Sequence, residues 1–180
     1  MSFYYFVASL PAVSLMAPPP LRADEYRAEA RRLLDPATVT ELDSIMTGDG
    51  ESARSALAGR WRAVNTQMRN ACARTRASML DVDAAPHLRP HAGFSNYIEQ
   101  AVVEAYAKAN PMERELSLDR FRWALLDEWA REAPFGLDAV LAYGLKVKLA
   151  ERWARLSDEA GRARLTETIG RVREALASQA

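Results

Sequence analysis

Few side chains in this 180-residue sequence are of a type and at a spacing that could do chemistry. The two histidines, His87 and His91, lie four residues apart, and on a helix they would point at one metal ion. Pro86 and Pro90 interrupt that segment, so we expect an exposed loop rather than a metal-binding or pH-sensing pair. The single cysteine, Cys72, falls on an apolar face of a predicted helix, which favours a small core residue over a reactive thiol.

The motifs of the common enzyme classes are missing. The eight glycines are scattered, and none precedes a Lys-Ser or Lys-Thr pair that would mark a phosphate-binding loop. A serine or cysteine nucleophile would have only the two loop histidines as its general base. The acidic pairs Asp127-Glu128 and Asp158-Glu159 fall on solvent faces or at helix ends. We therefore expect a protein that is not an enzyme, with no cofactor, no metal and no small-molecule substrate.

One charge asymmetry stands out in a chain whose formal net charge is zero. Residues 51–80 carry six arginines and one glutamate, whereas residues 95–135 carry eight acidic and five basic residues. Arg62, Arg69 and Arg76 recur every seven residues, so they drift only about 20° per step around a helix. This stripe is the predicted partner-binding surface, unless the acidic helices of the same chain neutralise it. No aromatic or lysine cluster accompanies it, so we do not expect nucleic-acid binding.

The elements that must position these residues are predicted to be helices. Hydrophobic periodicity indicates an all-α protein, an irregular bundle of about seven helices. The N-terminal half is expected to contain helices over about 24–34 and 36–47, with Asp35 and Gly48 at the ends of the second. One long helix follows over about 52–80, roughly 43 Å at about 1.5 Å per residue. Residues 81–93 are expected to form a loop, and Phe3–Leu10 fits either a short strand or a helical turn.

The C-terminal half is predicted to hold four helices. Ser95, Ser117 and Ser157 are expected to cap three of them, and the Pro134-Phe135-Gly136 turn precedes the other. That helix has an apolar arc too wide for one contact, so it should be central. An aromatic-rich core is expected from residues on consecutive inward faces, namely Phe121, Trp123, Leu125, Trp129, Tyr143 and Trp153. We expect residues 1–180 to form one domain, divisible into halves 1–93 and 94–180.

The first twenty residues are apolar but do not fit a targeting segment. No basic residue precedes Arg22, and Pro11 breaks the apolar run, so neither a secretory signal nor a membrane span is expected. One cysteine cannot form an internal disulfide, which favours a reducing compartment. The expected location is the cytoplasm.

Four segments spread over almost the whole chain resemble a family of proteins encoded in bacterial V-type (A/V-type) ATPase operons. They are YYFVASLP at 4–11 followed by three prolines, MRNACARTRA at 68–77, RFRWALLDE at 120–128 and LAYGLKVKLAERW at 141–153. That family stands where the operon would carry the central-stalk subunit called C or d, an all-helical funnel that seats the rotor shaft on the membrane ring. The chain is short for a complete three-lobed funnel.

This resemblance implies a non-catalytic component or assembly factor of a V-type ATPase, with a central-stalk-like role. Its partners would be rotor or stalk subunits, and it would reach the inner face of the cell membrane only through the complex. The resemblance supplies no catalytic residues. The alternative from the sequence is a general helical interaction or assembly protein without a rotary role.

Overall fold

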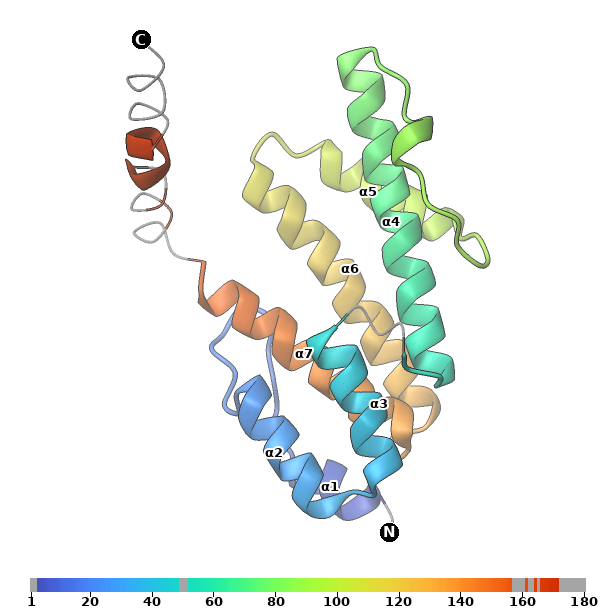
Figure 1. Ribbon diagram of the computed structural model, residues 1–180, viewed down its shortest axis with the longest axis vertical. Coiled ribbons are helices and arrows are strands. Elements are labelled where there is room, and N and C mark those ends of the chain that lie inside the picture. The colour runs from blue at the N-terminus through green and yellow to red at the C-terminus, as the bar shows by residue number, and fades with distance from the viewer. Residues whose placement is uncertain (1–2, 49–51, 157–160, 162–163, 165, 172–180) are drawn as a thin grey trace.

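The computed structural model describes residues 3–48, 52–156, 161, 164 and 166–171. Within these residues the fold is all-α, as the sequence predicts, and contains no strand. Its elements are α1 (Phe3–Ser9), α2 (Ala23–Leu33), α3 (Pro36–Thr47), α4 (Ala56–Leu80), the 3-10 turn η1 (Ala85–His87), α5 (Asn96–Tyr106), α6 (Pro111–Glu132) and α7 (Leu137–Ala154). Figure 1 shows α1, α2, α3 and α7 gathered at one end and α4 and α5 reaching to the other, with α6 between them.

Capping side chains fix the starts of α3 and α4. The Asp35 carboxylate accepts a hydrogen bond from the Thr38 amide at 3.0 Å, as the sequence predicts for this helix start. Ser55 caps α4 by accepting from the Ala58 amide at 3.3 Å. The long helix therefore begins at Ala56, four residues after the predicted start.

Glu41 of α3 joins the start of α4 to the preceding helix. Its carboxylate accepts hydrogen bonds from the backbone N–H groups of Arg54, at 2.8 Å, and Ser55, at 3.0 Å. Burial opposes ionisation of this carboxyl, but these donors outweigh burial and hold the pKa of Glu41 below its usual value.

The boundary between α5 and α6 differs from the prediction. Ser117 does not cap a helix, because α6 already begins at Pro111. The Asn110 side chain accepts from the Met112 amide at 2.9 Å, so the Asn-Pro pair starts α6 rather than ending the helix before it. Ser95 precedes α5 as predicted, but its side chain makes no capping hydrogen bond.

Near the N-terminus the structure decides between the two predicted alternatives, and near the C-terminus part of a predicted helix lies outside the described residues. Phe3–Ser9 forms the helix α1, and Phe6 is buried against the rest of the fold. Ser157 lies outside the described residues, whereas residues 166–171 are helical. In the described part of the chain, no helix is both long and apolar enough to cross a membrane.

Two hydrophobic clusters form the interior. The large cluster contains residues of α1, α2, α3 and α7 together with Leu57 of α4 and Leu126 and Trp129 of α6. The small cluster contains Met68, Ala71, Ile98, Val102, Ala105 and Leu118, from α4, α5 and α6. Helices α4 and α6 thus each contribute to both clusters, and neither cluster is confined to one side of residue 93.

Helix α7 is central, as its wide apolar arc predicts, and packs against α1, α2, α3, α4 and α6. Trp129 and Trp153 are buried in the large cluster, with Trp123, Leu125 and Tyr143 packed against it. The expected aromatic core is therefore present, except that Phe121 packs against the small cluster instead.

Helix α7 lies close against α2 and α3 at Gly144. A methyl group there would lie 2.8 Å from Met46 Sδ, 3.0 Å from Tyr26 Cε1 and 3.1 Å from Leu42 Cδ1. Tyr26 is fixed in this position, because its hydroxyl donates a hydrogen bond to the Val140 carbonyl at 2.8 Å.

Candidate binding sites

The three arginines of the predicted stripe do not share one surface. Arg62 is half-buried and donates to the Ala53 carbonyl at 3.1 Å. Arg69 is exposed and lines the same cavity as Arg62, whereas Arg76 lies at a separate hollow near the end of α4. The stripe therefore divides between two candidate sites.

Other arginines of α4 are neutralised within the chain. Arg60 pairs with Glu132 at 3.0 Å and with Asp138 at 2.9 Å, and Arg74 pairs with Glu99 at 2.7 Å. The sequence leaves open whether the basic helix packs against acidic helices of the same chain. At Arg60 and Arg74 it does. Neither Arg69 nor Arg76 has a salt bridge within the described part of the chain.

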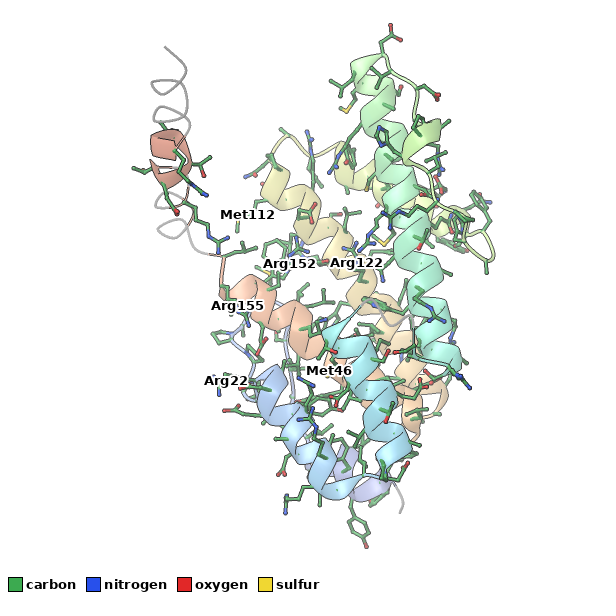
Figure 2. The ribbon with its side chains drawn as sticks, viewed as in Figure 1. Arg22, Met46, Met112, Arg122, Arg152 and Arg155 are labelled. Carbon is green, nitrogen blue, oxygen red and sulfur yellow. The ribbon has the colours of Figure 1, made fainter. Side chains whose placement is uncertain are left out.

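The first site is a cavity of about 730 Å³ between α3, α4, α6 and α7, here called the basic cavity. Figure 2 shows Arg152 of α7 beside α6, and Arg122 of α6 on the side towards α4. Trp61 and four aliphatic side chains form its apolar wall. Among the described residues its lining includes two carboxylates and eight cationic side chains, which are Arg62, Arg69, Arg89, Arg122, Lys148, Arg152, Arg155 and Arg164.

Asp119 is the buried carboxylate of this cavity, with no exposed surface. It accepts hydrogen bonds from Arg122 at 2.6 Å, from Arg152 at 2.9 Å and from the indole N–H of Trp153 at 2.9 Å. Arg152 also donates to Glu115 at 2.8 Å. Burial works against the charge of Arg152, but these carboxylates raise its pKa overall.

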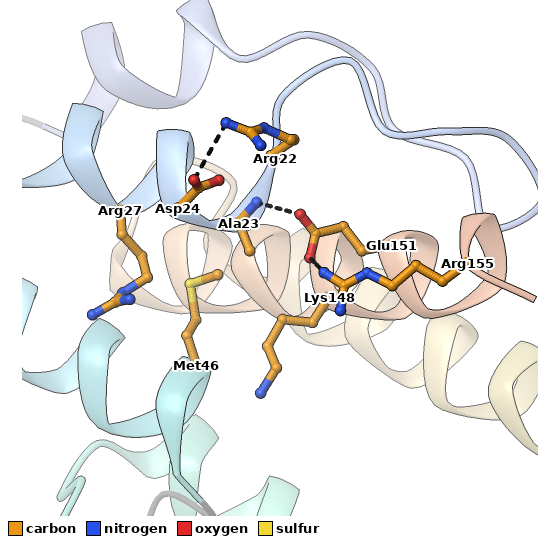
Figure 3. A pocket seen from close by; sticks show the side chains of 8 residues that line it. All are labelled: Arg22, Ala23, Asp24, Arg27, Met46, Lys148, Glu151 and Arg155. Carbon is orange, nitrogen blue, oxygen red and sulfur yellow. Dashed lines mark hydrogen bonds and ion pairs between the residues drawn. The ribbon is translucent and has the colours of Figure 1, made fainter.

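Glu151 is the second carboxylate, and it too is engaged within the chain. It accepts a hydrogen bond from the Ala23 amide at 2.8 Å and another from Arg155 at 3.0 Å (Figure 3). Both carboxylates of the basic cavity are therefore already satisfied. The cationic side chains around them remain in excess.

Lys148 stands between the basic cavity and a second hollow of about 420 Å³, here called the side pocket, at α2 and α3. Its amine makes no hydrogen bond or salt bridge with any described residue, and in Figure 3 it points away from Glu151. Burial lowers the pKa of the Lys148 amine, the nearby Arg27 lowers it further, and Glu151 acts in the opposite direction. Arg27 itself is paired with Asp43 at 2.6 Å.

The loop before α5 brings a further cation to the basic cavity. Asn70 of α4 donates to the Arg89 carbonyl at 2.7 Å and accepts from the Arg89 amide at 3.0 Å. These two bonds fix the backbone of the loop against α4. The Arg89 side chain lines the cavity without a hydrogen-bond partner among the described residues.

The second site is a hollow of about 310 Å³ where α4 and α5 end and α6 begins, here called the Tyr106 notch. Arg76 and Arg114 lie over the Tyr106 ring, 5.9 Å and 5.5 Å from its centre. Neither arginine has a salt bridge with a described carboxylate. Glu115 and apolar side chains form the rest of the lining, and Met79 and Leu80 are 63% and 72% exposed.

Cys72 lies beside the notch. Burial raises the pKa of the Cys72 thiol, and its hydrogen bond to Tyr106 and the charge of Arg76 oppose that rise. Burial also raises the pKa of Tyr106. A thiol of raised pKa is a poor nucleophile near neutral pH.

The two histidines do not form a shared site. His87 is exposed at the end of η1, and His91 is half-buried in the loop that follows. The Nδ1 atom of His91 is buried without a hydrogen-bond partner among the described residues. In the same part of the chain, no group of three or more His, Cys, Asp or Glu side chains could hold a metal ion.

The sequence prediction missed Asp119 and Lys148. Asp119 entered the prediction only as one of the eight acidic residues of 95–135, although it precedes the buried Leu126 by seven residues and so shares its helix face. That spacing was a usable signal. No local pattern marks Lys148, because the residues around its side chain belong to α2 and α3, more than a hundred positions earlier in the sequence.

Comparison with known proteins gives one match. A family model described as "Protein of unknown function (DUF2764)" matches residues 94–175. This region contains α5, α6 and α7, and with them Asp119, Lys148 and the Tyr106 side of the notch. A search of curated proteins and a search of solved structures each found no match.

Proposed function

We propose that this protein is a non-catalytic, central-stalk-like component or assembly factor of a bacterial V-type ATPase, and that it binds a rotor or stalk subunit. The four sequence segments that resemble the operon-encoded family support the proposal, and two of them, at 120–128 and 141–153, lie in α6 and α7. On this proposal the protein works in the cytoplasm and meets the membrane only through the complex.

The Tyr106 notch is the structural observation that carries the binding part of the proposal. It combines exposed aliphatic side chains with two arginines that have no carboxylate partner among the described residues. Glu115 also lines the notch, but its carboxylate is already bonded to Arg152. The surface therefore suits an amphipathic helix with apolar anchors and flanking carboxylates.

The test is affinity purification of the tagged full chain from its native host, with identification of co-purifying subunits. We expect V-type ATPase subunits in the wild-type sample. The variant Arg76→Glu with Arg114→Glu should lose most of them, because reversed charges repel an acidic partner. A purification that recovers no ATPase subunit would refute the proposed function.

A matched control separates this surface from general charge effects. Arg120 and Arg131 are exposed on α6, away from the notch, and have no salt bridge among the described residues. Arg120→Glu with Arg131→Glu changes the net charge equally and should leave subunit recovery within about twofold of wild type. Equal losses in the two folded variants would remove the notch from the interface.

A further inference from the structure

The lining of the basic cavity is strongly basic, although the chain as a whole has no net charge. The whole chain has equal numbers of acidic and basic residues. At this cavity the described lining has four times as many cations as carboxylates, and both carboxylates are bonded inside the protein. An assembly of like charges around one hollow costs free energy unless an anion neutralises it.

The cations without a partner surround the cavity rather than follow one face. Lys148 comes from α7, Arg69 from α4 and Arg89 from the loop before α5. None of the three side chains makes a hydrogen bond or a salt bridge with a described residue. Charges placed on three separate elements can close around a compact anion, whereas an acidic helix would present its carboxylates along a line.

The Lys148 amine is the strongest of these pointers. It is half-buried beside Arg27. The positive charge of Arg27 therefore adds to the free-energy cost of keeping the Lys148 amine protonated. In Figure 3 it points away from Glu151 and pairs with none of the residues drawn. A bound anion would supply the missing counter-charge to Lys148, and arginines nearby could hold its oxygens with paired N–H donors.

We propose that the basic cavity binds a compact polyphosphate anion, either inorganic polyphosphate or the phosphate chain of a nucleotide. The cavity volume of about 730 Å³ is within the range of small-ligand sites, about 300–1,000 Å³. Trp61 offers an aromatic wall against which a nucleotide base can stack. The ligand is a bound effector, not a substrate, and the inference does not depend on the proposed ATPase role.

The test uses the purified full chain and inorganic tripolyphosphate as the probe, measured by isothermal titration calorimetry at low salt and at 150 mM salt. We expect one molecule per chain, with affinity falling as salt rises. Lys148→Gln combined with Arg69→Gln should weaken binding at least tenfold. The matched control, Lys108→Gln with Arg120→Gln, removes the same two charges from exposed positions and should weaken it less than twofold.

Thermal unfolding gives a second reading on the same proteins. The cavity variant should melt no lower than wild type, because Lys148 has no partner to lose. Tripolyphosphate should raise the melting temperature of wild type and of the control variant, but not that of the cavity variant. ATP binding more tightly than tripolyphosphate would identify a nucleotide as the ligand, and equal binding would identify polyphosphate. Absence of binding, equal losses in the two variants, or tighter binding of an octaglutamate peptide would overturn the proposal.

Discussion

Asp119 is a buried carboxylate that pairs with two arginine side chains. Its two oxygens accept from two guanidinium groups and from an indole N–H, so one carboxylate links α6 to the end of α7. Breaking a buried ion pair costs several kcal/mol, because the partners keep their charge and lose their neutralising group. The residue therefore orients two arginines of the basic cavity as well as stabilising the fold.

Replacing this carboxylate should be costly. We expect Asp119→Asn to lower the free energy of unfolding by about 3 kcal/mol, measured by urea denaturation, because the amide nitrogen faces donors and the charge is lost. Asp24→Asn is the control, since Asp24 pairs with Arg22 where both side chains are more than half exposed, and it should cost less than about 1 kcal/mol. A loss for Asp119→Asn no larger than that of the control would contradict the role assigned to this residue.

At the scale of the helix, the contact between Glu41 and the start of α4 should depend on pH. The pKa of Glu41 is lowered in the folded protein, so the ionised form stabilises the fold. This contribution is present above the unfolded pKa of about 4.3 and is lost as the pH falls through the folded value. We expect Glu41→Gln to cost about 1 kcal/mol at pH 7 in urea denaturation.

The same titration supplies the check. Between pH 7 and pH 3.5 the stability difference between wild type and Glu41→Gln should shrink towards zero. Glu104→Gln, an exposed glutamate of α5 without a salt bridge among the described residues, should show little difference at any pH. A difference for Glu41→Gln that stays constant with pH would mean that its charge does not act on the start of α4.

The helices were predictable where a local signal defines them. Asp35 caps α3 as expected, and the long helix needed only a small shift in its start, because capping residues act within a few positions of the chain. Ser117 failed as a cap, because a serine inside a helix looks the same locally as one before it. The basic cavity was not predictable, since its walls come from helices far apart in sequence and meet only through tertiary packing.

The whole molecule should unfold as one unit. Leu57 and Met68 place α4 in the large and the small cluster, and Leu126 and Leu118 do the same for α6. Because α4 and α6 belong to both clusters, loss of one cluster should also disrupt the packing of the other. We expect differential scanning calorimetry to show one transition, with equal calorimetric and van't Hoff enthalpies.

Separate expression of residues 1–93 and 94–180 offers the complementary measurement. Each half lacks part of both clusters, so neither fragment should show the cooperative unfolding of the intact chain. Two resolved transitions in the intact protein, or a cooperatively folded fragment, would show instead that the two halves are independent domains.

Gly144 has a consequence for the orientation of α7. Because there is room for a hydrogen atom but not for a methyl group, a rotation of α7 that brought another residue to this point would press its side chain against Tyr26 and Met46. Lys148 follows about one helical turn later, on nearly the same side of the helix. The close contact at Gly144 thus fixes the rotation of α7 about its axis. That rotation in turn determines the side of the helix from which Lys148 extends.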